Sequence, residues 1–138
     1  METDETIARA WLGEMQACVR AVDFERCRAI FARDVVGFGT KAAIAVGLDA
    51  LERDQWRHIW GSIRNFTFRS DSLYFKRYGD GLWLACPWSS EAPAPDGTWR
   101  NRPGRITAVL ERRGDKWLAV HTHHSLAPVV SESREFTD

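Results

Sequence analysis

The sequence predicts an α+β domain, in which helices pack in the concave face of a strongly curved antiparallel sheet. Two observations predict this class. Apolar residues recur every three or four positions over much of the first 62 residues, which is typical of amphipathic helices. Residues 65–126 instead show strand-like segments separated by glycine-containing turns. Strands of this length curl, so we expect the sheet and the helices to enclose a cavity.

The chain begins with two predicted helices. Residues 4–21 carry an apolar stripe at helical spacing, and Thr3 or Asp4 can cap the free amides of the first turn. Asp23 is the expected N-cap of a second, short helix over residues 24–31.

A third helix is predicted over residues 48–62. Trp56 and Trp60, four positions apart, form one apolar ridge. A second stripe follows helical spacing and contains one polar residue. Its members are Leu48, Leu51, Gln55, Ile59 and Ile63.

The predicted strands are rich in β-branched and aromatic residues and end at glycines or polar turns. A proline-rich polar connector is expected over residues 89–104, between the strands of the last two hairpins. The strands are expected at 34–40, within 41–46, in the stretch 65–78, and at 82–88, 105–113 and 116–126.

Length and composition restrict the function. The 138 residues suit one domain, 1–138, with an ordered core over about 4–128 and a polar tail over 129–138. Nineteen basic and nineteen acidic residues cancel, so the sequence predicts neither a nucleic-acid nor a membrane partner. Three scattered cysteines and an acidic start without a leader pattern predict a reduced, cytoplasmic protein.

The stretch "WLAVHTHHSL", residues 117–126, contains three of the four histidines. Alternation along this strand places His121 and His123 on one face together with Trp117 and Ser125. With a three-residue turn over 113–115, Leu110 lies opposite Leu118 and Ala108 opposite Val120. The same register sets Thr107 opposite His121 and Arg105 opposite His123.

This polar face suggests the wall of a cavity, where an imidazole can donate, accept or exchange protons. The alternative is a hydrogen-bonded polar patch that orients the sheet or a subunit interface. A metal site is disfavoured, because the candidate third ligands have no signature spacing and Arg105 would repel a cation. Those candidates are His58, Asp34 and Glu91.

The segments "FARDVVGFGT", "VGLDALERDQWRHIW" and "PGRITAVLERRGDKWLAVHTHHS" resemble the SnoaL-like group of the nuclear transport factor two-like superfamily, over about residues 4–128. The resemblance implies a cone-shaped fold with an apolar pocket, and dimers formed through the outer sheet faces. Related ketosteroid isomerases use an aspartate on the first strand, where this chain has Gly39. The resemblance extends to the association domain of a calmodulin-dependent kinase.

We therefore expect a homodimeric protein that binds a small apolar or anionic organic molecule and needs no cofactor or metal. His121 and His123 are the candidate acid–base groups for an isomerase or lyase reaction, with Arg105 holding an anionic oxygen. A non-catalytic association module is the alternative. The remaining candidate pocket residues are Thr107, Trp117, Ser125, Trp56, Trp60 and Trp83.

Overall fold

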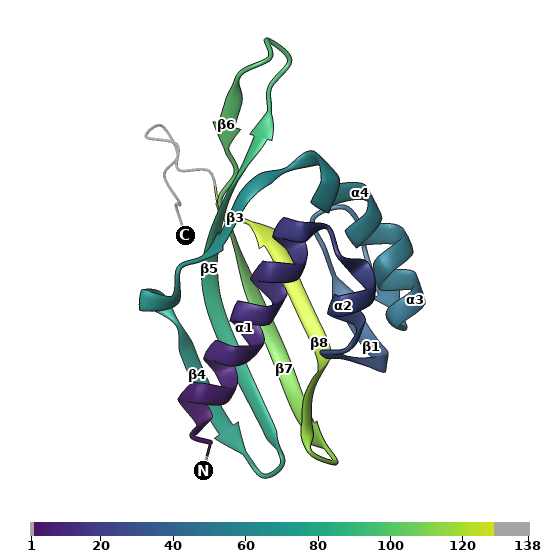
Figure 1. Cartoon of the computed structure of the whole chain (residues 1–138), viewed down its shortest axis with the longest axis vertical. Helices are drawn as coiled ribbons and strands as arrows, with labels where there is room; N and C mark the ends of the chain where they lie inside the picture. Colours follow the sequence, from purple (N-terminus) through teal and green to yellow (C-terminus); the bar gives the residue numbers. More distant parts are fainter. Residues whose placement is uncertain (1, 129–138) are drawn as a thin grey trace, which may run out of the picture.

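A computed structural model describes residues 2–128 (Figure 1). The helices lie on one face of an eight-stranded curved sheet, which confirms the predicted α+β class. None of the helices within residues 2–128 is long and apolar enough to cross a membrane.

The first two helices begin where their caps predict. α1, Asp4–Ala21, is capped by the Thr3 hydroxyl, which accepts from the Thr6 amide at 3.1 Å. α2, Phe24–Arg28, is shorter than predicted. The chain already enters the first strand at Phe31, and the Ile30 carbonyl accepts from the Ala119 amide of the sheet.

The helical segment 48–62 is continuous but not uniform. It consists of α3 (Leu48–Leu51), a π-helical turn η1 (Glu52–Trp56), α4 (Arg57–Ile59) and a 3₁₀ turn η2 (Trp60–Ser62). A π-helical turn contains more residues than an α-helical turn. The consecutive side chains of Gln55 and Trp56 are therefore both buried.

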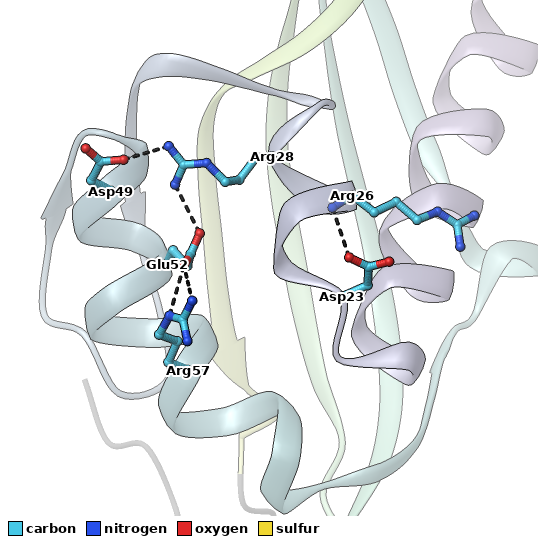
Figure 2. Close-up of polar contacts among 6 residues, drawn as sticks. All are labelled: Asp23, Arg26, Arg28, Asp49, Glu52 and Arg57. Atoms are coloured by element: carbon cyan, nitrogen blue, oxygen red, sulfur yellow. Dashed lines mark hydrogen bonds and ion pairs between the residues drawn. The ribbon is translucent and has the colours of Figure 1, made fainter.

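Ion pairs join this segment to α2 (Figure 2). Arg28 donates to Asp49 at 2.6 Å and to Glu52 at 3.1 Å, and Arg57 also donates to Glu52. Figure 2 also shows Asp23 capping α2, where its carboxylate accepts from the Arg26 amide at 3.1 Å. Glu52 thus joins the helical segment to α2 through Arg28, whereas its bond with Arg57 stays within the segment.

The strands form one mixed sheet. The main path runs β2–β1–β8–β7–β5–β3, and β4 and β6 pair with parts of β5. All pairs are antiparallel except β1 with β8, which run parallel. A 3₁₀ turn η3, Ser70–Ser72, separates β3 from β4, so the predicted stretch 65–78 is two strands. The strands are β1 (Phe31–Phe38), β2 (Ala45–Val46), β3 (Arg64–Phe68), β4 (Tyr74–Tyr78), β5 (Gly81–Pro93), β6 (Trp99–Asn101), β7 (Gly104–Arg113) and β8 (Lys116–Leu126).

The predicted connector over residues 89–104 is wrong in part. β5 continues to Pro93 and pairs with β6, and this hairpin projects beyond the rest of the sheet (Figure 1). The sequence did not indicate this strand, because its small polar residues show no apolar alternation. Backbone pairing with β6 holds it in the sheet. The Arg102 amide, for example, donates to the Ser90 carbonyl at 2.7 Å.

The core lies between α1 and the inner face of the sheet. Leu84 of β5 lies opposite Ala108 of β7, and both are fully buried. Trp11 and Met15 of α1 belong to the same buried cluster. The inner face of β7 is therefore its apolar face, as hydrophobic burial requires.

Candidate functional site

The hairpin of the histidines differs from the predicted register at its turn. The turn has two residues, Gly114 and Asp115, and Gly114 adopts a φ of +68°, which a glycine allows without strain. Leu110 consequently lies opposite Ala119 rather than Leu118.

A β-bulge shifts the register again along β8. Val120 is an extra residue between the pairs Leu110–Ala119 and Val109–His121. Thr107 therefore lies opposite His123, and the predicted Thr107–His121 and Arg105–His123 pairs are wrong. Ala108 lies opposite Thr122 instead of Val120.

The predicted polar face exists, but it is the outer face of the sheet. The helices cover the apolar face of β7, so the alternate side chains point away from the cone interior. The expectation that His121 and His123 face the cavity is therefore wrong. The same correction applies to the rest of the set, Arg105, Thr107 and Ser125.

These outer-face residues contact one another and β1. The His121 Nδ1 atom lies 2.7 Å from the Val36 carbonyl oxygen. The His123 ring centroid lies 5.1 Å from that of Phe38. Arg105 donates to the Ser125 hydroxyl at 3.0 Å.

The four candidate tryptophans separate into three places. Trp56 and Trp60 line a cavity inside the cone and stack with ring centroids 4.8 Å apart. Trp117 packs against the core, with the Arg77 guanidinium 5.0 Å from its ring centroid, and does not line that cavity. Trp83 lies opposite Val109 and so belongs to the outer face.

The cavity lies between the inner face of the sheet, α1 and the helical segment 48–62. It contains about 480 Å³ of empty space including its open mouth, but only about 30 Å³ is available to the centres of water-sized molecules. The smaller number describes the room for a ligand, because the larger one includes solvent outside. Among residues 2–128, six aromatic side chains line the cavity: Phe31, Phe38, Trp56, Trp60, Phe66 and Trp88.

Five polar side chains also line the cavity, and none of these described residues is a carboxylate. Two nitrogens in its wall, Trp88 Nε1 and His124 Nε2, are buried without a hydrogen-bond partner among residues 2–128. Such groups are rare, because burying them unpaired costs about 1–3 kcal/mol. The polar side chains are Thr40, Gln55, Arg102, Thr122 and His124.

Three of these side chains form one hydrogen-bonded chain. The Gln55 carbonyl oxygen accepts from the backbone amides of Lys41 and Ala42, each at 2.8 Å. The Gln55 amide nitrogen donates to the Thr40 hydroxyl at 2.9 Å. Arg102 donates to the same hydroxyl, also at 2.9 Å.

His124 is neutral at physiological pH. Burial lowers the pKa of His124 to about 4, and the charges of Arg102 and His123 act in the same direction. The Trp88 ring centroid lies 6.1 Å from that of His124, and the Arg102 guanidinium lies 5.5 Å from the Trp88 ring. Arg102 is itself partly buried, and burial lowers the pKa of its guanidinium, which nevertheless stays charged.

The structure explains why position 39 is a glycine, which the sequence alone does not reveal. A Cβ atom at this position would overlap the amide of Gln55. The Gln55 side chain, which belongs to the helical segment 48–62, therefore fills the space that a side chain at position 39 would need. A carboxylate at position 39 is incompatible with this arrangement.

Sequence reasoning missed the residues that line the polar end of the cavity. Gln55 gave a signal, because it is the one polar member of an otherwise apolar helical stripe. Arg102 lies in the predicted connector and gave none. The alternation that sets His121 and His123 on one face of the strand leaves His124 on the other, but no pattern in the sequence indicates which face the helices cover.

Comparisons with known proteins agree with the observed fold. A family model for the SnoaL-like domain matches residues 8–129. The search of curated proteins finds no match.

Several solved structures share the architecture at low sequence identity. A nuclear transport factor 2-like superfamily protein from Salmonella enterica serovar Typhimurium has a TM-score of 0.78 at 14% identity, covering 96% of this chain and 97% of that one. A ketosteroid isomerase-like protein from Erwinia carotovora atroseptica has a TM-score of 0.73 at 13% identity, covering 93% and 100%. A protein of unknown function from Pseudomonas putida KT2440 has a TM-score of 0.70 at 24% identity, covering 95% and 91%. These likenesses establish the fold alone.

Proposed function

Because the chain belongs to the SnoaL-like domain family, we propose that it binds a small, largely apolar organic molecule inside the cone. The observation that carries this proposal is the pair of unpartnered buried nitrogens, Trp88 Nε1 and His124 Nε2, in the wall of an aromatic cavity. An apolar wall with a few polar groups is typical of ligand pockets. A bound ligand can supply the hydrogen bonds that these nitrogens lack.

The cavity limits the size of the molecule. Its free space of about 30 Å³ has room for the centres of only a few molecules the size of water. A ligand therefore enters only if aromatic side chains in the wall move aside. A small, flat molecule requires the smallest displacement of the stacked Trp56 and Trp60 rings.

Binding is favoured over proton transfer of the ketosteroid-isomerase kind. Position 39 has no carboxylate, and none lines the cavity among the described residues. The neutral His124 is the remaining proton acceptor, and its pKa of about 4 makes it a weak base. If a lyase or isomerase activity exists, His124 rather than His121 or His123 is the residue to carry it.

Two neighbouring histidines provide the test. His124 lines the cavity, whereas the adjacent His123 lies on the outer face, so His124→Ala and His123→Ala form a matched pair. The protein is purified, and ligands are sought by native mass spectrometry and by thermal shift with a panel of small aromatic compounds. We expect binding to the native chain and to His123→Ala, and weaker binding to His124→Ala. Equal binding by both variants, or no binding by the native chain, would contradict the proposal.

We also propose that a second copy of the chain covers the outer sheet face. Val46 and Tyr74 are each 70% exposed, although both are large hydrophobic residues of the sheet. A hollow on this face is lined in part by Tyr74, Arg105 and His123. Light scattering of the native chain and of Tyr74→Glu tests this: a dimer that the variant splits supports it, and a native monomer rejects it.

The three buried free thiols suit a reducing compartment, so we propose a cytoplasmic location. Burial raises the pKa of Cys86 to about 11, which keeps that thiol protonated and unreactive. Cell fractionation with a tagged full-length chain tests the location.

A further inference from the structure

The Thr40 hydroxyl is the centre of the polar end of the cavity. Its oxygen accepts from the Gln55 amide nitrogen and from Arg102, each at 2.9 Å. A hydroxyl oxygen has two lone pairs, and both are used by these donors. The remaining capacity of this group is its own O–H, which can only donate.

Gln55 can likewise only donate a hydrogen bond to a ligand. Its carbonyl oxygen accepts two backbone amides, from Lys41 and Ala42, and so has no free lone pair. Its amide nitrogen carries two hydrogens, of which one is donated to Thr40. The second hydrogen has no partner among the hydrogen bonds of the described residues.

Arg102 differs from the paired arginines of the surface. Arg28, Arg57 and Arg113 each lie within ion-pair distance of an acidic side chain. Arg102 has no such neighbour within residues 2–128, although it is partly buried in the cavity wall. It uses one N–H on Thr40 and keeps further donors and a full positive charge.

The flanking groups do not supply a competing negative charge. Trp88 Nε1 is a donor by its chemistry, and the neutral His124 can donate from Nε2 in one tautomer. Thr122 adds a hydroxyl that can donate or accept. The described lining therefore contains one unneutralised cation and several donors, but no anion.

We propose that this end of the cavity binds the carboxylate of a small organic acid, with Arg102 and the Thr40 hydroxyl donating to its oxygens. The proposal rests on the proposed function and specifies the chemical class of the ligand. A carboxylate is acceptor-only and offers about four lone-pair sites, which matches a set of donors around a guanidinium. An amide or an alcohol of the same shape leaves the buried charge of Arg102 unneutralised.

Matched acids and amides test the proposal on the intact chain. The probes are benzoate with benzamide, phenylacetate with phenylacetamide, and 4-methylpentanoate with its amide. Dissociation constants are measured by ligand-detected NMR at neutral pH. We expect each acid that binds to bind the native protein at least tenfold more tightly than its amide.

Variants then identify the arginine that binds the carboxylate. Arg102→Gln is expected to weaken acid binding at least tenfold and to change amide binding less than threefold. Arg105→Gln is the matched control, because Arg105 lies on the outer face without an acidic partner among the described ion pairs. Thr40→Val removes the hydroxyl and should weaken the acids, whereas Thr40→Ser should restore them.

The outcomes separate the two proposals. Amides that bind as tightly as acids would overturn the carboxylate site and leave small-molecule binding intact. Acids whose binding responds to Arg105→Gln and not to Arg102→Gln would also overturn it. Binding of neither acids nor amides would reject the proposed function itself. The comparison of acid with amide needs only the native chain, so the test stands even if a variant does not fold.

Discussion

The side-chain amide of Gln55 occupies the space that any side chain at position 39 would need. Three hydrogen bonds hold this amide, to the backbone amides of Lys41 and Ala42 and to the Thr40 hydroxyl. The loop that follows β1 and the helical segment 48–62 are therefore joined by one polar side chain at the edge of the cavity. Gly39 is a packing requirement of this joint.

Gly39→Ala should destabilise the protein by about 2–4 kcal/mol, because the Gln55 amide must leave its partners or the strand must shift. Urea unfolding measures the change. Gly13→Ala is the control, since a Cβ there meets no atom within 4 Å and the residue lies in α1. It should stabilise by about 0.5–1 kcal/mol. A cost for Gly39→Ala that is no smaller in a Gln55→Ala background would show that the two residues do not compete for space.

Glu52→Gln should destabilise the joint between α2 and the helical segment. Burial alone would raise the pKa of Glu52, but hydrogen bonds from Arg57 and Arg28 outweigh it and lower that pKa. The Glu52 side chain is 16% exposed, so we expect a loss of about 1–2 kcal/mol in the free energy of unfolding.

Asp54 is the control for this measurement. It pairs with the neighbouring Arg53 while 44% of its side chain is exposed, so Asp54→Asn should leave the free energy of unfolding nearly unchanged. Equal losses for both variants would show that the contact between α2 and the helical segment contributes nothing specific.

Stability should fall as the pH is lowered from about 6.5 to about 4. The pKa of His124 is about 4 in the folded protein and about 6.5 in a free chain, so the unfolded state binds the proton more readily in this window. The loss is on the order of 2–3 kcal/mol by pH 4. Most of this loss of stability occurs at pH values above those at which carboxyl groups usually titrate.

Thermal melts at half-unit pH steps measure this effect. His124→Phe should flatten the dependence between pH 6.5 and 4.5, whereas His58→Ala, on the exposed side of α4, should keep it. A slope that persists in His124→Phe would assign the titration to another group.

The sequence predicted those parts of the fold that depend on local patterns. α1 and α2 begin at their predicted caps, since capping involves residues three positions apart. The side of the sheet that His121 and His123 occupy could not be read in this way. It depends on which face the helices cover, and the bulge at Val120 that sets their register has no marker in the sequence.

The candidate site was predictable in kind and in two of its aromatic residues, but not in its polar residues. A cavity with aromatic walls follows from a curled sheet and from Trp56 and Trp60, both of which line it. Arg102 reaches the cavity only because the β5–β6 hairpin returns the chain there, a contact with Thr40 that joins residues 62 positions apart. No rule based on residue spacing predicts a contact between residues so far apart in the sequence.

The most direct test of ligand binding inside the cone uses the indole N–H signals of the seven tryptophans. Each signal is assigned by a Trp→Phe variant, and ¹H–¹⁵N spectra are recorded while phenylacetate, or the tightest binder of the acid and amide panel, is added. We expect the signals of Trp56, Trp60 and Trp88 to shift together, while those of Trp83 and Trp99 stay in place. Shifts of Trp83 alone, with the three cavity signals unchanged, would place binding on the outer face and contradict the account.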